Sequence, residues 1–295
     1  MSFFPRTRMF LELVRFSHTL FALPFALAAM FVAAGGIPSW QVFVAILVCM
    51  ATGRNSAMAF NRLIDAKFDA NNPRTANRHI PAGKLSSLQV KVFIGINGLL
   101  FVLGAFTLNS LAFACAIPVW FFLLSYSLWK RFSWACHAFL GIAIGMSPLG
   151  AWIAVRGEFA WFPALLGLML GLWIHGFDII YATQDEETDR ALGLRSIPVR
   201  FGATKSLRIA LVSHVGMLLV GLVLGYLYAL PWPWWLSQGL CAVVLVYIHR
   251  FRKSNDLDRM NQDFFFANVL ISLFCLAGLG LVVYLQGGIG NVPKF

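Results

Sequence analysis

Most of this chain consists of apolar runs long enough to cross a lipid bilayer, and this feature constrains its fold most strongly. The mean hydropathy is +0.76 and only 12% of the residues are charged, about half the usual share in soluble domains. Runs near twenty residues favour membrane helices, because a helix satisfies its own backbone polar groups in lipid. Nine runs qualify: 15–36, 40–64, 88–107, 110–129, 134–155, 159–181, 205–229, 232–250 and 263–286. We therefore predict an all-α integral membrane protein, a single polytopic domain over residues 1–295.

The distribution of basic residues predicts the topology of these nine spans. The net charge is +11, which by itself would also suit a nucleic-acid-binding protein. With the N-terminus inside, however, 19 of the 23 basic residues fall on the cytoplasmic side, as expected for a membrane protein. The charge excess therefore indicates a cytoplasmic N-terminus and an external C-terminus, and nucleic acid is not an expected partner.

One polar pattern occurs twice, with 120 residues between the copies. In each copy two aspartates are four residues apart, first Asp65 and Asp69, then Asp185 and Asp189. Spacings of four, seven and eleven residues return to nearly the same helix face. Arg54, Asn61 and Asp65 therefore share one helix face, and Asp178, Asp185 and Asp189 share another. Tyr181 also belongs to the second copy. The equal spacing predicts two related halves that meet at a central cavity.

The paired aspartates are the predicted metal ligands. Seven of the 12 acidic residues fall within the two short segments that hold these pairs. One alternative is that these carboxylates at helix ends simply face water. Against it, acidic residues on the cytoplasmic side do not help to set the membrane topology, so their clustering there needs another reason. Hard oxygen ligands suit Mg²⁺, which proteins commonly hold with one or two carboxylates plus substrate phosphates. We predict that Asp65, Asp69, Asp185 and Asp189 bind Mg²⁺ together with a diphosphate.

Two long inner loops, residues 70–87 and 190–204, follow directly from the aspartate pairs and are expected to cap the site. They carry basic residues whose side chains match phosphate oxygens and stabilise a departing diphosphate. The same residues also agree with the ordinary positive-inside bias, and a lysine at a span end can be a membrane anchor. The candidates for substrate binding in and near these loops are Arg74, Arg78, Arg195 and Lys130.

Several polar residues lie deeper in the predicted spans. A charge near the bilayer centre costs ~2.5–3.5 kcal/mol, so Arg54, Asn61 and Asp178 are expected to have a role. Arg54 and Asp178 could form an ion pair between two helices, or line the cavity floor and orient substrate and metal ligands. His137 and His175 show no metal-binding spacing and are expected to be hydrogen-bonded helix contacts.

These residues carry a family resemblance that covers the whole chain. The segment from Asn61 to Asp69, followed by Arg74 and Arg78, resembles the first motif of the UbiA superfamily of intramembrane aromatic prenyltransferases. The segment from Asp178 to Asp189 is similar to the second motif. Arg62 and His79 depart from the family pattern, which commonly has an acid and a proline at these places. The start of the first span resembles the hydroxybenzoate branch and its relatives in quinone pathways.

The resemblance implies transfer of a polyprenyl group from a polyprenyl diphosphate to an aromatic acceptor, such as a hydroxybenzoate-type acid in ubiquinone or menaquinone biosynthesis. Two Mg²⁺ ions would bind with the diphosphate at a cytoplasmic mouth, in a bacterial inner membrane. Asn61, Asp178 and Tyr181 would orient substrate or ligands, and Arg15 and Arg54 are candidates for the acceptor's carboxylate. A cation-coupled secondary transporter and a lipid phosphotransferase are the alternatives. The acceptor, the chain length, the proton-accepting residue and the oligomeric state stay open.

Overall fold

The computed structural model describes residues 9–10, 12–14, 21–251 and 257–286, with side chains left undescribed for 251 and 257–264. Arg15 lies outside the described residues. Within them every regular element is a helix. The long helices are α2 (Leu23–Ala34), α3 (Trp40–Ile64), α5 (Ser87–Phe106), α6 (Ser110–Ser125), α7 (Cys136–Arg156), α8 (Trp161–Ala182), α10 (Ile197–Leu227), α11 (Trp232–Phe251) and α12 (Leu257–Leu285).

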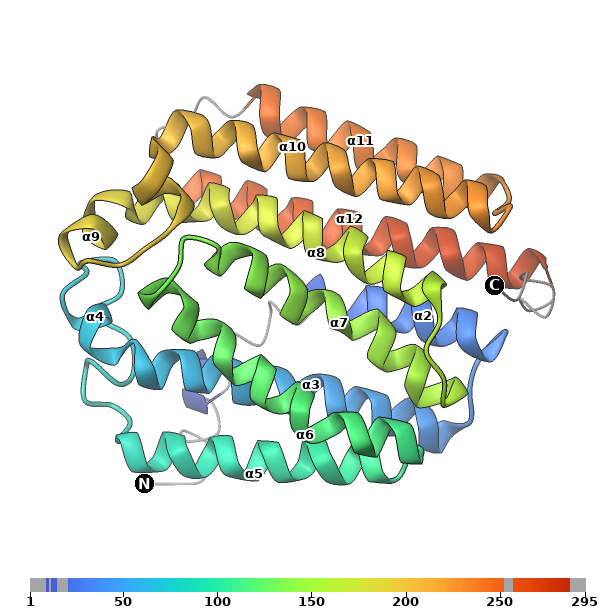
Figure 1. Cartoon of the computed structure of the whole chain (residues 1–295), viewed down its shortest axis with the longest axis horizontal. Coiled ribbons are helices and arrows are strands. Elements are labelled where there is room, and N and C mark those ends of the chain that lie inside the picture. Colours follow the sequence, from blue (N-terminus) through green and yellow to red (C-terminus); the bar gives the residue numbers. More distant parts are fainter. Residues whose placement is uncertain (1–8, 11, 15–20, 252–256, 287–295) are drawn as a thin grey trace.

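The long helices run side by side from one end of the molecule to the other (Figure 1). Among the described residues, seven helical segments are long and apolar enough to cross a membrane. Two further helices, α2 and α11, coincide with the other predicted spans, but α2 has 12 described residues and α11 is not among the seven. The prediction of helical membrane spans is therefore confirmed, while the count of nine and the two related halves stay predictions.

The two polar motifs lie where long helices are interrupted. Helix α3 ends at Ile64, and Asp65 stands between it and the short helix α4 (Ala66–Ala70). In the second motif, α8 is followed by a 3-10 turn η3 (Thr183–Asp185) and by α9 (Glu186–Ala191). Figure 1 shows α4 and α9 close together at one end of the molecule. The fold therefore brings both motifs to one end.

The two predicted capping loops differ in length. Residues 71–86 connect α4 to α5 without a further helix, as the sequence predicts. Residues 192–196 separate α9 from α10, and a kink at Gly202 (φ 74°, ψ 163°) sets the first residues of α10 apart from the long helix that follows. The side chain of Ser196 accepts a hydrogen bond from the Val199 backbone N–H, and a proline lies in the first turn of α10. Both features are typical helix starts.

Helices α7 and α8 cross at a point where both have glycine. A Cβ on Gly145 would lie 2.5 Å from the Gly167 carbonyl oxygen, and a Cβ on Gly167 would lie 2.3 Å from the Gly145 carbonyl oxygen. Only glycine allows backbones to approach this closely. Because α7 and α8 carry His137 and Asp178, this crossing sets the distance between two polar side chains described below.

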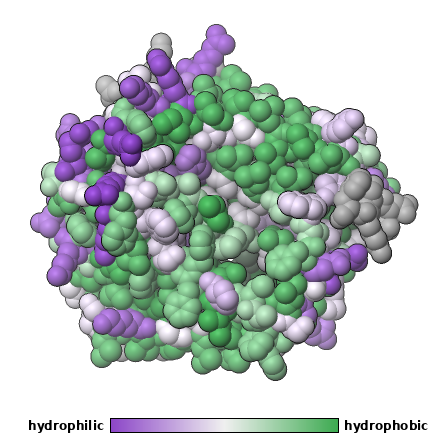
Figure 2. Space-filling view, viewed as in Figure 1, coloured by the Kyte–Doolittle hydropathy of each residue, from purple (hydrophilic) through white to green (hydrophobic). Residues whose placement is uncertain are grey.

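The surface has a large apolar share, as expected for a protein in lipid. Large apolar side chains such as Leu99, Phe121 and Val212 are 60%, 61% and 70% exposed. Figure 2 shows apolar surface over most of one face, with hydrophilic residues gathered mainly toward the end that holds α4 and α9. The polar motifs therefore lie at one boundary of the apolar part.

Candidate active site

A polar cavity of about 250 Å³ lies at the end of the bundle where α4 meets α9. Its walls come from both motifs, from the 71–86 loop, from the 3-10 turn η2 (Tyr126–Arg131) and from the start of α7. Its polar and charged lining residues are Asn61, Arg62, Asp65, Asp69, Asn72, Arg74, Thr75, Arg78, Tyr126, Ser127, Lys130, His137, Asp178, Tyr181, Asp185 and Asp189. The structure thus brings four aspartates and several basic residues into one space.

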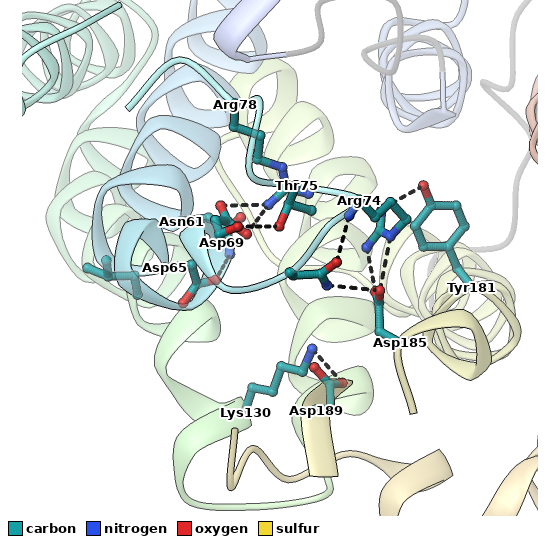
Figure 3. A network of polar contacts seen from close by, with 12 residues as sticks. Asn61, Asp65, Asp69, Arg74, Thr75, Arg78, Lys130, Tyr181, Asp185 and Asp189 are labelled. Atoms are coloured by element: carbon teal, nitrogen blue, oxygen red, sulfur yellow. Dashed lines mark hydrogen bonds and ion pairs between the residues drawn. The ribbon is translucent and has the colours of Figure 1, made fainter. Parts of the chain in front are cut away.

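The first aspartate pair is held by basic residues on either side. Asp69 accepts two contacts from Arg78 Nη1, at 2.6 and 2.8 Å. Asp65 accepts from Arg131 Nη2 at 3.1 Å and from the Asn61 amide at 3.0 Å. Burial raises the pKa of the Asp65 carboxyl, and the positive charge of Arg131 opposes that rise. These contacts fix the orientation of both carboxylates (Figure 3).

The second pair is held by residues from other parts of the chain. Arg74 donates to both oxygens of Asp185, from Nε at 3.0 Å and from Nη2 at 2.5 Å. The Asn72 amide adds a contact to Asp185 at 3.3 Å. Asp189, which is 3% exposed, lies 2.7 Å from Lys130 Nζ. The loop after the first motif thus binds the second motif directly (Figure 3).

Lys130 and Arg131 are neighbours in η2 but contact different motifs. Lys130 pairs with Asp189 of the second motif, and Arg131 pairs with Asp65 of the first. The turn η2 therefore lies between the two motifs, and with Arg74 and Arg78 it supplies one cation for each of the four aspartates. This arrangement neutralises the carboxylates locally.

The donor set fits Mg²⁺ bound together with a diphosphate. The cavity offers four carboxylates and the amides of Asn61 and Asn72, all hard oxygen donors, which Mg²⁺ prefers. Within the described part of the chain, no three His, Cys, Asp or Glu side chains group closely enough to hold a metal ion. Mg²⁺ usually completes its shell with water and substrate phosphates, so this donor set suits a metal–phosphate complex better than an ion alone.

A second cavity, of about 400 Å³, lies beside the polar one in the apolar part of the bundle. Its lining is almost entirely apolar and comes mainly from α3, α5, α6, α7 and α8, with Phe21 and Ala22 just before α2. Tyr126, Leu140 and Asp178 line both cavities. These three residues therefore mark the boundary between a polar chamber and an apolar one.

Asp178 has a partner that the sequence did not indicate. His137 Nδ1 lies 2.6 Å from Asp178 Oδ2, and the Ile197 backbone N–H donates to His137 Nε2 at 3.3 Å. Arg54 lines the apolar cavity and donates from Nη1 to the Val14 carbonyl oxygen at 2.9 Å. Of the two sequence hypotheses for Arg54 and Asp178, the structure favours cavity lining.

The structure brings most of the predicted site residues together. Arg195 is an exception, because its side chain donates to the Phe132 carbonyl oxygen at 2.7 Å and does not line the polar cavity. Arg54 lines the other cavity, and Arg15 is not described. The predicted residues that line the polar cavity are Asn61, Asp65, Asp69, Arg74, Arg78, Lys130, Asp178, Tyr181, Asp185 and Asp189.

Three residues whose side chains contact the predicted carboxylates were missed as candidates. Arg131 follows Lys130 directly, so the neighbouring candidate was a usable signal. Asn72 lies in the first capping loop between the motif and Arg74, and it contacts Asp185. His137 gave no signal, because its partner Asp178 is 41 residues away and no local spacing connects them. The expectation that His137 forms a hydrogen-bonded helix contact is confirmed.

Fold and site together define a class: a membrane protein, helical throughout its described residues, in which a carboxylate-lined polar chamber borders an apolar one. Residues 22–270 match the model of the UbiA prenyltransferase family. The chain therefore belongs to this family, and it is a prenyltransferase.

Curated relatives agree with this assignment. The chain is 28% identical over 233 residues to a 4-hydroxybenzoate octaprenyltransferase of Vibrio campbellii, covering 78% of this chain and 81% of the relative. A 4-hydroxybenzoate octaprenyltransferase of Photobacterium profundum is 26% identical over 287 residues, covering 95% and 98%. In the second comparison the similarity extends over nearly the full length of both proteins.

Solved structures share the fold. A UbiA homolog from Aeropyrum pernix K1 superposes with a TM-score of 0.81 at 26% identity, over 90% of this chain and 97% of the other. A UbiA homolog from Archaeoglobus fulgidus, solved with GPP and Mg²⁺, gives a TM-score of 0.71 at 18% identity, over 92% and 99%. At that identity the second likeness shows the fold alone.

Proposed function

We propose that this protein transfers a polyprenyl group from a polyprenyl diphosphate to a small aromatic acid of the hydroxybenzoate type, releasing diphosphate, as a step of quinone biosynthesis. The observation that carries the proposal is the pair of adjacent cavities, which share three lining residues. A polyprenyl diphosphate has a charged head and an apolar tail, and the polar and apolar chambers match these two parts. The names of the curated relatives support the acceptor class.

The basic residues bind the diphosphate and stabilise the charge that develops on it. Arg74, Arg78, Lys130 and Arg131 each face a carboxylate in the free protein. When a diphosphate enters, these side chains turn toward its oxygens, since guanidinium and ammonium groups stabilise a leaving diphosphate. Arg195 takes no direct part, because its side chain is engaged outside the cavity.

The aspartates hold Mg²⁺, with two ions proposed, one for each aspartate pair. Asp65 and Asp69 form one wall, Asp185 and Asp189 form the other, and Asn61 holds Asp65 in place. Bound with the diphosphate, Mg²⁺ supplies Lewis-acid stabilisation of the departing oxygens. Tyr181 lies beside Arg74, with a contact of 3.5 Å between Arg74 Nη1 and the tyrosine hydroxyl, and it orients this arginine.

The apolar chamber binds the tail and protects the allylic cation from water. Its lining is almost entirely apolar, so it excludes the water that would otherwise capture the cation. Arg54 is the described basic residue of this lining, and it is a candidate partner for the acceptor's carboxylate. Arg15, the other candidate, stays a proposal from the sequence.

The membrane arrangement completes the proposal. We assign nine spans, with α2 and α11 added to the seven segments that meet the length and apolarity criteria. The N-terminus and the mouth of the polar cavity face the cytoplasm and the C-terminus faces outward, as the basic residues indicate. The 71–86 loop and residues 192–196 cap the mouth, and the bacterial relatives support an inner-membrane location.

One experiment tests the reaction. The purified protein is incubated with Mg²⁺, a labelled polyprenyl diphosphate and a panel of aromatic acids that includes 4-hydroxybenzoate. A single prenylated acid, identified by mass, is the expected result, and EDTA should stop its formation. Absence of any Mg²⁺-dependent product across the panel contradicts the proposal. Ion-gradient-dependent flux in vesicles without prenyl transfer would instead support the transporter.

A further inference from the structure

Asp178 lies at the place where the new carbon–carbon bond would form. It lines both cavities, together with Tyr126 and Leu140. The reacting carbon of a prenyl diphosphate joins the diphosphate to the tail, so it lies where the polar chamber meets the apolar one. Asp178 is the carboxylate at this boundary, and the reasoning rests on the proposed function.

The carboxylate of Asp178 is oriented from behind by His137. The backbone N–H of Ile197 donates to His137 Nε2, so this nitrogen is an acceptor and the ring proton is on Nδ1. Nδ1–H therefore donates to Asp178 Oδ2, at 2.6 Å. The His137 side chain is 3% exposed and that of Asp178 is 30% exposed. The histidine is thus the buried support, and the carboxylate faces the cavity.

The other carboxylates of the site are less suited to accept a proton. Asp65, Asp69, Asp185 and Asp189 each pair with a cation in the free protein and are the proposed metal ligands in the loaded one. A carboxylate bound to a cation is a weak base. Asp178 differs, because it is not one of the proposed metal ligands, its described hydrogen-bond partner is His137, and within the described residues no hydrogen bond reaches its Oδ1.

We propose that Asp178 accepts the ring proton of the aromatic acceptor and that His137 positions it. The allylic C–O bond breaks and its electron pair leaves with the diphosphate. A π electron pair of the acceptor ring forms the new C–C bond, and the electron pair of the ring C–H bond then restores aromaticity. The proton passes to Asp178 Oδ1, and water accepts it after the products leave.

Asp178→Asn tests the base, with two readouts on the same variant. The first is product formation from 4-hydroxybenzoate, which should fall roughly 10²–10⁴-fold, the usual effect of a general base. The second is movement of an ¹⁸O label from the bridging to the non-bridging positions of the prenyl diphosphate, which reports C–O ionisation and return. This exchange should persist at the wild-type rate, because ionisation does not need the base.

The two readouts separate this inference from the proposed function. If Asp178→Asn loses label exchange together with product, Asp178 acts on ionisation or diphosphate binding and the inference is overturned. If it keeps full product formation, the inference is also overturned. If the wild-type protein neither exchanges label nor forms a product, the proposed function fails and takes the inference with it.

The positioning role of His137 is tested by a conservative pair. His137→Gln keeps an N–H donor and should retain most of kcat, whereas His137→Phe should lower kcat roughly tenfold or more with the KM for the prenyl diphosphate unchanged. With ring-deuterated 4-hydroxybenzoate, His137→Phe should also show a larger isotope effect than wild type, because proton removal has become slower. His175→Phe is the matched control, since His175 bonds Ser213 and lines neither cavity. Equal kinetics for the Gln and Phe variants overturn the positioning role.

Discussion

Arg74 and Asp185 are 111 residues apart in the chain, yet the guanidinium donates to both carboxylate oxygens, at 3.0 and 2.5 Å. The bond connects the loop after the first motif to the centre of the second. A bidentate pair of this kind fixes geometry as well as charge. Arg74 therefore holds one of the proposed metal ligands in a fixed orientation.

Removing Arg74 should expose Asp185 to divalent ions even without substrate. For Arg74→Ala we expect Mn²⁺, used as an EPR-visible substitute for Mg²⁺, to bind the substrate-free protein about three- to tenfold more tightly, since a partly exposed ion pair contributes on the order of 1 kcal/mol. Arg190→Ala is the control, because Arg190 forms an exposed pair with Glu186 within α9. Unchanged Mn²⁺ affinity for Arg74→Ala would show that the pair does not compete with metal.

Neutralising one metal-binding carboxylate should remove activity without unfolding the protein. For Asp185→Asn we expect prenyl transfer to fall roughly 10²–10³-fold, the effect of losing one strong electrostatic contact in an active site. Glu187→Gln, an exposed acid on α9, should keep wild-type activity. Thermal unfolding in detergent checks the fold of both variants, and an Asp185→Asn protein with full activity would contradict the metal assignment.

The crossing of α7 and α8 should not tolerate a methyl group. In Gly167→Ala the new Cβ would meet a backbone carbonyl oxygen at 2.3 Å, so the helices must separate at a cost of about 1–3 kcal/mol. We expect a lower thermal midpoint and reduced activity, because the distance from His137 to Asp178 changes. Gly239→Ala in α11 meets no atom within 4 Å and should be neutral or slightly stabilising. Equal midpoints for the two variants would contradict the close approach.

Filling the apolar chamber should shorten the prenyl chain that the protein accepts. Ala112, on α6, lines this chamber, and the added ring of Ala112→Trp would occupy space needed by a long tail. We expect kcat/KM to fall at least tenfold for a forty-carbon donor and to change little for geranyl diphosphate. Each buried methylene contributes ~0.8 kcal/mol, and the long tail would lose several of these contacts together. Ala114→Trp, on the exposed face of the same helix, should leave both donors unaffected. A loss shared equally by both donors would speak against tail binding there.

Local sequence pattern was sufficient for the fold class and for half of the site. Asp65 and Asp69 were recognisable because a four-residue spacing puts them on one helix face and because acids are scarce in an apolar chain. The same reasoning found Asp185 and Asp189. The predicted membrane topology and the two long inner loops then indicated that both aspartate pairs lie at the same end of the helix bundle. The structure confirms this, because both pairs line one cavity.

Arg195 is a predicted site residue that local sequence pattern placed wrongly, because its side chain does not line the polar cavity. It lies in a predicted capping loop beside the second motif, as Arg74 does beside the first, so composition treats them alike. In the structure Arg195 donates to a carbonyl oxygen of Phe132, whereas Arg74 reaches across to Asp185. The difference depends on the rotation of each loop against its neighbours, which no local spacing encodes.

The sequence by itself determined that the chain is a helical membrane protein with two carboxylate pairs at span ends, because lipid requires long apolar runs and makes each charge conspicuous. Only the tertiary structure decided which cation faces which carboxylate, that Lys130 and Arg131 contact opposite motifs, and that His137 supports Asp178 at the boundary of two cavities. Apart from Arg78 and Asp69, which are 9 positions apart, those contacts join residues 41 to 111 positions apart, and they depend on how closely helices such as α7 and α8 pack.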